Sequence, residues 1–177
     1  MNISTGLALA TALVALQIGP LECSAHAEYV LQLMPGGGYP ANVRSAVEDY
    51  LLRDPEGRSQ IEQANQQHRR DNLEAESDQQ ILDGLNAALV DLNDDGVDEL
   101  IIQFSPYFCY CGTGGCTVIV YKKVDGRWRT IGGFLDSGFD LTILDQTDGG
   151  YHEIRTRGLS RGEEIPFVLK WDGREYH

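Results

Sequence analysis

The sequence predicts an α+β fold in which N-terminal helices precede about eight antiparallel strands arranged as two related four-stranded units. Three observations support this prediction. Apolar residues recur with a helical period up to about residue 85 and with a period of two after Asn86. Asp-Gly turn signals occur within the second region. The two sets of four strands also align with each other as a degenerate repeat.

The first 27 residues have the pattern of a signal peptide. Leu7–Ile18 is a twelve-residue apolar run, which is too short to span a bilayer. Ala25–Ala27 then supplies the small-x-small pattern that a signal peptidase accepts, so that Glu28 is the expected mature start. A lipoprotein anchor at Cys23 is the weaker alternative, because Glu22 occupies the position where a small residue is needed. The sequence therefore predicts a periplasmic or secreted protein.

The remaining residues, 28–177, have the length of one ordinary domain with a single sizeable core. Removing the signal changes the net charge from −13 to −12, because Glu22 is the one charged residue lost. Such a surface repels phosphate backbones and anionic lipid. We therefore expect no nucleic-acid partner and no membrane insertion after cleavage, and a cation or a basic protein as the partner.

The segment 28–85 is expected to be mainly helical. Glu28–Tyr39 is short and irregular, whereas Ala41–Arg53 carries apolar residues on one helical face and stops before Asp54-Pro55. Ser59–Asp83 is rich in Gln, Glu and Arg, which is typical of an exposed helix, and a break is expected near Arg69–Asp71.

The segment 86–177 is predicted to be an antiparallel β-domain. Two Asp-Gly pairs, Asp125–Gly126 and Asp172–Gly173, are hairpin signals. The expected strands are Ala88–Asp91, Glu99–Ser105, Thr117–Lys122, Trp128–Phe134, Phe139–Leu144, Tyr151–Arg157, Pro166–Trp171 and the last residues.

These strands form two degenerate repeats, 86–134 and 139–177. Asp91 aligns with Asp145 at an offset of 54 residues, and Asp125 aligns with Asp172 at an offset of 47. Each unit then has the order strand, loop, strand, long connection, strand, Asp-Gly turn and strand, which is propeller-blade-like in outline. Whether the units form a barrel, a sandwich or a propeller fragment is left open by the sequence.

The connection DLNDDGVDE, residues 91–99, places five acidic residues in nine positions at the start of a strand. Like charges so close repel one another, and a bound divalent cation removes that penalty. Gly96 permits a sharp bend around which alternate oxygens can converge. The candidate metal ligands are Asp91, Asn93, Asp95, the carbonyl group of Val97, and Glu99.

All these donors are hard oxygens, which favours Ca²⁺ over zinc or copper. An EF-hand needs a glutamate at position twelve of the loop, where this chain has Ile102, and no helix is expected to follow. The alternative is a solvated acidic turn, because Asp, Asn and Gly also favour turns for local reasons.

The pattern D-x-N-x-D-G-x-x-E leading into a strand resembles the calcium loops of FG-GAP repeats, as in integrin alpha-subunit propellers. The resemblance implies the same five calcium ligands and leaves Asp98 either pointing outward or supporting the ligands without binding the ion. A full propeller of that family needs many more blades than this chain supplies, so the resemblance extends to the loop and not to the architecture. In the second repeat the equivalent positions are Asp145, Thr147, Gly149, Tyr151 and Glu153. Because Gly149 replaces a carboxylate, we expect a vestigial turn there with little metal affinity.

Three cysteines remain after signal cleavage, namely Cys109, Cys111 and Cys116. In an oxidising compartment this odd count implies one short disulfide and one leftover thiol. The glycines of the intervening loop favour a Cys111–Cys116 bridge, and Cys109–Cys116 is the competing pairing. A redox or metal-binding role of these cysteines stays open. Residues 107–128 are also similar to small exported bacterial proteins of uncharacterised family.

The sequence predicts a non-catalytic protein. The histidines are scattered at 26, 68, 152 and 177, and His152 is expected on an exposed strand position. The first hypothesis is therefore an exported calcium-binding module with a disulfide-stapled loop. The alternative is a periplasmic inhibitor or adaptor of a hydrolase such as a lysozyme, using the Cys loop and the flanking aromatic residues Tyr107, Phe108 and Tyr110 as its contact surface.

Overall fold

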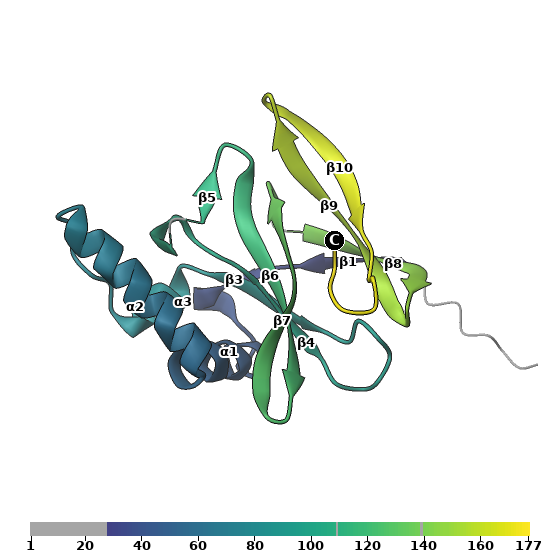
Figure 1. Cartoon of the computed structure of the whole chain (residues 1–177), viewed down its shortest axis with the longest axis horizontal. Helices are drawn as coiled ribbons and strands as arrows, with labels where there is room; N and C mark the ends of the chain where they lie inside the picture. The colour runs from purple at the N-terminus through teal and green to yellow at the C-terminus, as the bar shows by residue number, and fades with distance from the viewer. Residues whose placement is uncertain (1–27, 109, 139) are drawn as a thin grey trace, which may run out of the picture.

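A computed structural model describes residues 28–108, 110–138 and 140–177 of the chain. The predicted signal peptide, 1–27, and Cys109 lie outside the described residues. In the described part, helices cover one face of a six-stranded sheet and a four-stranded sheet covers the other, which confirms the α+β class (Figure 1). Among these residues, no helix is long and apolar enough to cross a membrane.

The helices follow local sequence signals. Helix α1 (Ala41–Glu48) continues into the π-helix η2 (Asp49–Arg53), so the predicted helix over Ala41–Arg53 is confirmed. Helix α2 (Pro55–Arg70) begins behind Asp54, whose carboxylate accepts a hydrogen bond from the Glu56 N–H. It ends where the break was expected, and α3 (Asp78–Asp83) follows with a capping box.

Both sheets are antiparallel. The six-stranded sheet has the order β2-β3-β4-β6-β5, with β7 pairing with β6, and the four-stranded sheet has the order β1-β8-β9-β10. The strands are β1 (Tyr29–Gln32), β2 (Met34–Pro35), β3 (Asn86–Val90), β4 (Glu99–Gln103), β5 (Cys111–Gly112), β6 (Gly115–Val124), β7 (Arg127–Asp136), β8 (Asp140–Asp148), β9 (Tyr151–Ser160) and β10 (Glu163–Leu169).

Seven of the expected strands are present as β3, β4, β6, β7, β8, β9 and β10. The expected eighth strand is reduced to isolated bridges that Tyr176 makes with Gly132 and Trp171. Strands β1, β2 and β5 were not predicted. The first two lie in the segment expected to be irregular, and they are strands because they pair with distant partners, β8 and β3.

The two repeats occupy the two sheets. In each, a hairpin (β3–β4 or β8–β9) is followed by a strand that pairs with its second member (β6 or β10). An apolar cluster drawn from both sheets fills the space between them. The two sheets therefore pack face to face as a sandwich.

Strand β4 lies at the centre of the middle layer, and all five of its residues are buried. Leu100 and Ile102 face the helices, whereas Ile101 faces the second sheet. This burial on both sides explains the uninterrupted apolar run that follows Glu99. It also holds the end of the acidic connection, at Glu99, inside the protein.

Candidate metal site

The acidic connection between β3 and β4 is a tight turn with two residues of positive φ, Asp94 (+57°) and Gly96 (+81°). Glycine is favoured at such a backbone conformation, as the sequence predicts for the bend at Gly96. Asp98 is exposed to solvent.

Asp91 organises the turn from its first position. Its Oδ1 accepts hydrogen bonds from the N–H groups of Asn93 (3.3 Å) and Asp95 (3.2 Å), and its Oδ2 accepts one from Gly96 N–H (2.7 Å). A carboxylate has about four lone-pair sites, so these three bonds leave capacity for a cation. The Asp91 side chain is therefore fixed inside the curve of the turn.

Asn93 and Asp95 meet within the same turn. The Asn93 Nδ2 donates to Asp95 Oδ2 at 3.0 Å, and Asp95 Oδ1 accepts from Val97 N–H at 2.8 Å. The hydrogen bond from the Val97 backbone, followed by the one from the Asn93 side chain, lowers the pKa of Asp95. Asp95 is therefore ionised at neutral pH, with its oxygens at the mouth of the turn.

Glu99 is the last of the candidate ligands and the first residue of β4. Its side chain is 1% exposed, and its Oε2 accepts a hydrogen bond from Leu92 N–H at 2.9 Å. The other oxygen, Oε1, is buried and has no hydrogen-bond partner in the part of the chain that the structure describes. Burial raises the pKa of this carboxyl group to about 7, and the hydrogen bond from Leu92 opposes the rise. An ionised carboxylate oxygen in such a place is costly unless a cation approaches it.

Lys122 of β6 brings a positive charge to this carboxylate. Its Nζ lies 4.0 Å from Glu99 Oε1 and 3.4 Å from Asp95 Oδ2, and donates a hydrogen bond to the Tyr151 hydroxyl group at 2.7 Å. Sequence reasoning missed Lys122 and Tyr151. The available signal was the two-residue period of the strand, because Lys122 lies on the same face of β6 as the inward-facing Val118 and Val120.

His152 was expected to be exposed, and this prediction is wrong. The residue is 6% exposed, with Nδ1 2.7 Å from the Leu144 carbonyl oxygen and Nε2 3.2 Å from Asp94 Oδ2. Its backbone N–H also donates to the Leu92 carbonyl group at 2.7 Å. The reason is that β9 packs against the acidic turn, so His152 joins that turn to the second sheet.

The set Asp91, Asn93, Asp95 and Glu99 thus occupies one turn and offers hard oxygen donors from three carboxylates and an amide. Within the described residues, no three His, Cys, Asp or Glu side chains already converge tightly enough to hold a metal ion. The physical reason is that the oxygens of Asp91 and Asp95 face backbone N–H groups and Lys122.

The corresponding turn of the second repeat is differently built. Asp145 is exposed, and Gly149 sits at the two-residue turn between β8 and β9 with φ of +54°. Glu153, the equivalent of Glu99, forms an ion pair with Lys170 at 2.8 Å between Oε1 and Nζ. This carboxylate therefore already has its positive partner.

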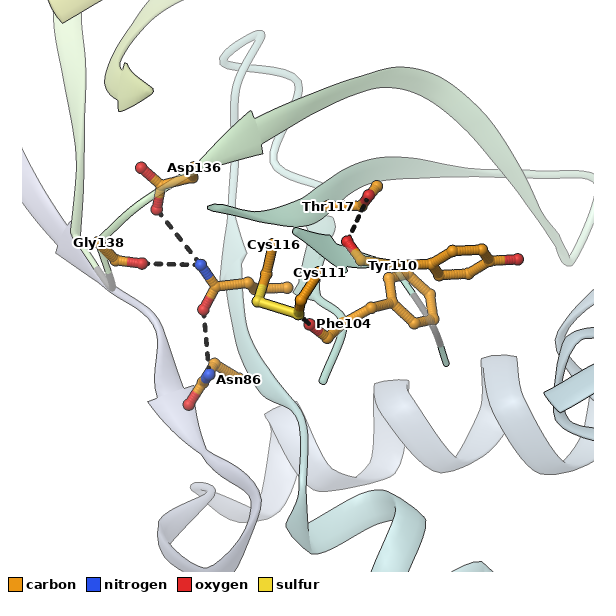
Figure 2. Close-up of a disulfide and its surroundings, with 9 residues drawn as sticks. Asn86, Phe104, Tyr110, Cys111, Cys116, Thr117, Asp136 and Gly138 are labelled. Carbon is orange, nitrogen blue, oxygen red and sulfur yellow. Dashed lines mark hydrogen bonds between the residues drawn. A yellow bond between two sulfur atoms is a disulfide. The ribbon is translucent and has the colours of Figure 1, made fainter. Parts of the chain in front are cut away.

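The disulfide joins Cys111 of β5 to Cys116 of β6, which confirms the favoured pairing (Figure 2). The two residues are register partners with a Cα–Cα distance of 3.9 Å. Thr117 links the two sides of this hairpin, because its N–H and its Oγ1 both donate hydrogen bonds to the Tyr110 carbonyl group. Cys109 falls outside the described residues.

The predicted aromatic contact surface is only partly present. Tyr107 and Phe108 are 7% and 4% exposed and belong to the core beneath the helices. The Tyr107 hydroxyl group hydrogen-bonds with Asn65 and accepts from Glu76 N–H. Tyr110 is 37% exposed, so it is the member of the trio that a partner can reach.

Residues 158–162, GLSRG, match the G-x-S-x-G pattern of serine hydrolases. The prediction of a non-catalytic protein overlooked this match. A nucleophile elbow places this serine on a sharp turn from a strand into a helix. Here Ser160 ends β9, and the chain turns through Arg161 and Gly162, both of positive φ, into β10. The pattern is therefore a β-hairpin turn and not a nucleophile elbow.

The fold and the site together define a two-sheet α+β protein with an acidic, glycine-containing turn that leads into its central strand, β4. No family model matches the chain, and no solved structure gives a significant match. Human integrin alpha-6 is 34% identical over 79 residues, which cover 40% of this chain and 7% of the integrin. This modest similarity supports an integrin-like relationship for part of the chain.

Proposed function

We propose that this protein is an exported, non-catalytic module that binds one Ca²⁺ ion in the turn Asp91–Glu99. The observation that carries the proposal is the buried Oε1 of Glu99, which has no hydrogen-bond partner among the described residues, while three further side chains with oxygen donors lie in the same turn. Asp91, Asn93, Asp95 and the Val97 carbonyl group would complete the ligand set. The partial similarity to integrin alpha-6 supports the same reading.

The ion would act as a structural clamp. The turn joins two neighbouring strands of the middle layer, and its last residue, Glu99, is buried. A dication there neutralises carboxylates that otherwise repel one another. Extracellular modules with comparable loops bind calcium with dissociation constants of roughly 10⁻⁴ to 10⁻³ M. At about ten times the dissociation constant, the ion adds about 1.4 kcal/mol to the stability.

Export is the second part of the proposal. Structural disulfides persist in oxidising compartments, and the Cys111–Cys116 bridge supports such a location. The signal-like pattern of residues 1–27 supports the same location.

Thermal unfolding with excess EDTA or with 10 mM CaCl₂ tests the calcium site. Asp95→Asn removes a ligand charge, and Asp98→Asn is its matched control because it removes the same charge from an exposed residue of the same turn that is not a proposed ligand. We expect calcium to raise the melting temperature of the wild type and of Asp98→Asn by several degrees, and to leave Asp95→Asn unchanged. A wild-type melting temperature that does not respond to calcium, at matched ionic strength, refutes the proposal.

A further inference from the structure

Lys122 is held between the acidic turn and the second sheet. Its Nζ donates a hydrogen bond to the Tyr151 hydroxyl group at 2.7 Å and a longer one to Asp95 Oδ2 at 3.4 Å, and it lies 4.0 Å from Glu99 Oε1. A lysine side chain is ordinarily an ammonium ion at neutral pH, so Lys122 brings a positive charge to this position. Its side chain is 28% exposed, which leaves room for the ammonium group to move.

The strand register explains why a lysine lies there. Leu100 and Tyr121 are the last pair of the β4–β6 ladder, and Glu99 and Lys122 are the next residues of these two strands just beyond it. The second repeat has the same relationship, since Ile154 and Leu169 are the last pair of the β9–β10 ladder, and Glu153 and Lys170 are the next residues beyond it. A glutamate facing a lysine at this point is thus built into both units.

The two repeats differ in the distance between the lysine ammonium group and the glutamate carboxylate. In the second repeat, where the turn lacks its third carboxylate, Lys170 Nζ is 2.8 Å from Glu153 Oε1. In the first repeat, Lys122 Nζ is 4.0 Å from Glu99 Oε1, which has no hydrogen-bond partner. The first lysine is therefore shared with Tyr151 instead of being committed to the glutamate.

We infer that Lys122 is a tethered counter-cation of the acidic turn, and that a divalent cation binds by displacing its ammonium group from Asp95 and Glu99 onto Tyr151. This inference rests on the proposed calcium function and names the residue that sets the affinity and charge selectivity of that site.

The physical consequence is that a cation must compete with this ammonium group in order to bind to the turn. An ammonium group tethered to β6 is always present at the turn, so a free ion must replace it or bind beside it. A monovalent cation brings no more charge than the ammonium group that it displaces, whereas a dication brings twice as much. Lys122 therefore weakens calcium binding and makes the turn selective for divalent ions.

Tyr151 is suited to receive the displaced group. Its hydroxyl group already accepts from Lys122, and Nζ lies 5.3 Å from the centroid of its ring. The ring is fixed from another side by stacking on Trp171, with centroids 4.2 Å apart. The acceptor thus stays in place when the ammonium group leaves the carboxylates.

Calorimetric titration of the full chain with CaCl₂ at constant ionic strength tests the inference. Lys122→Met removes the ammonium group, and Lys123→Met is the matched control, because Lys123 donates instead to Asp49 at 2.7 Å. We expect Lys122→Met to bind calcium about tenfold more tightly than the wild type, and Lys123→Met to stay within about twofold. Tyr151→Phe removes the receiving hydroxyl group, and we expect it to bind calcium more weakly than the wild type.

Opposite shifts in the Lys122→Met and Tyr151→Phe variants support displacement. Calcium affinity that is unchanged or lower in Lys122→Met overturns the role of Lys122 and leaves the calcium site standing. An absence of calcium binding in all four proteins rejects the calcium site itself, and the inference with it.

Discussion

The buried carboxylate of Glu99 accepts a hydrogen bond from the backbone N–H of Leu92 at 2.9 Å, and so closes the acidic turn from the inside. One oxygen is used in this bond, and the other has no hydrogen-bond partner. The side chain that fixes the turn is therefore also the one that we propose as a calcium ligand. Removing its charge and keeping its shape separates these two roles.

Glu99→Gln makes this separation. The glutamine oxygen can still accept from Leu92 N–H, whereas the buried negative charge is gone. We expect the metal-free variant at pH 8 to be more stable than the metal-free wild type, because a desolvated charge has been removed. We also expect calcium to add nothing to its stability. Urea unfolding with EDTA and with calcium measures both effects, and a variant that calcium still stabilises contradicts the proposed role of Glu99.

The second acidic turn should bind no calcium. Asp145 is exposed, Gly149 supplies no carboxylate, and Glu153 is paired with Lys170. We expect a calorimetric stoichiometry of one Ca²⁺ per chain, and an Asp145→Asn variant with wild-type affinity. A binding event that persists in Asp95→Ala would show that this turn is active.

The disulfide should stabilise its hairpin without affecting the metal site. A loop as short as Cys111–Cys116 gains roughly 2 kcal/mol from the bridge in the chain-entropy model. We expect the double variant Cys111→Ala/Cys116→Ala to lose about this much in urea unfolding and to keep its calcium affinity. A reducing agent should lower the stability of the wild type and leave the double variant unchanged. Loss of calcium binding in the double variant is the contrary result.

The ionised carboxylate of Asp49 should stabilise the folded protein at neutral pH, and this contribution should be lost in acid. Its Oδ2 accepts hydrogen bonds from Lys123 Nζ at 2.7 Å and from Trp128 Nε1 at 3.1 Å. The bond from Lys123 is the main cause of its lowered pKa. Folding therefore favours the ionised form, so the contribution is present above the ordinary value of 3.8 and disappears as the pH falls through the lower folded value.

The variant Asp49→Asn tests this pH dependence. We expect it to be about 1 kcal/mol less stable than the wild type at pH 7, a modest value because the carboxylate is partly exposed. The difference should shrink below about pH 4. Urea unfolding of both proteins between pH 3 and pH 7 measures it. A difference that is constant over this range means that the charge of Asp49 is not the cause.

Features that depend on near neighbours could be predicted from the sequence. The spacing of apolar residues in Ala41–Arg53 marked a helix, and Asp125–Gly126 marked the hairpin of β6 and β7, where both residues have positive φ. The Cys111–Cys116 bridge closes a gap of five positions. The acidic turn with its bend at Gly96 belongs to the same class. In each case the relevant contacts lie within one short segment, so local residue preferences are enough.

Features that depend on distant contacts were decided by the tertiary structure. Strand β1 exists because Tyr29–Gln32 pairs with β8, from the other end of the chain. Packing of the two sheets buries His152, and the helical layer covers Tyr107 and Phe108. Nothing in the sequence around the acidic turn indicated that Lys122 would approach it.

By itself, the sequence determined the acidic turn, the favoured Cys111–Cys116 bridge and seven of the strands, because short-range geometry and hydrophobic period specify them. Only the tertiary structure decided that Glu99 is buried with one oxygen unpaired and that Lys122 faces it from the next strand. The reason is that burial and ladder register are properties of packed layers, and they form only when segments far apart in the chain come together.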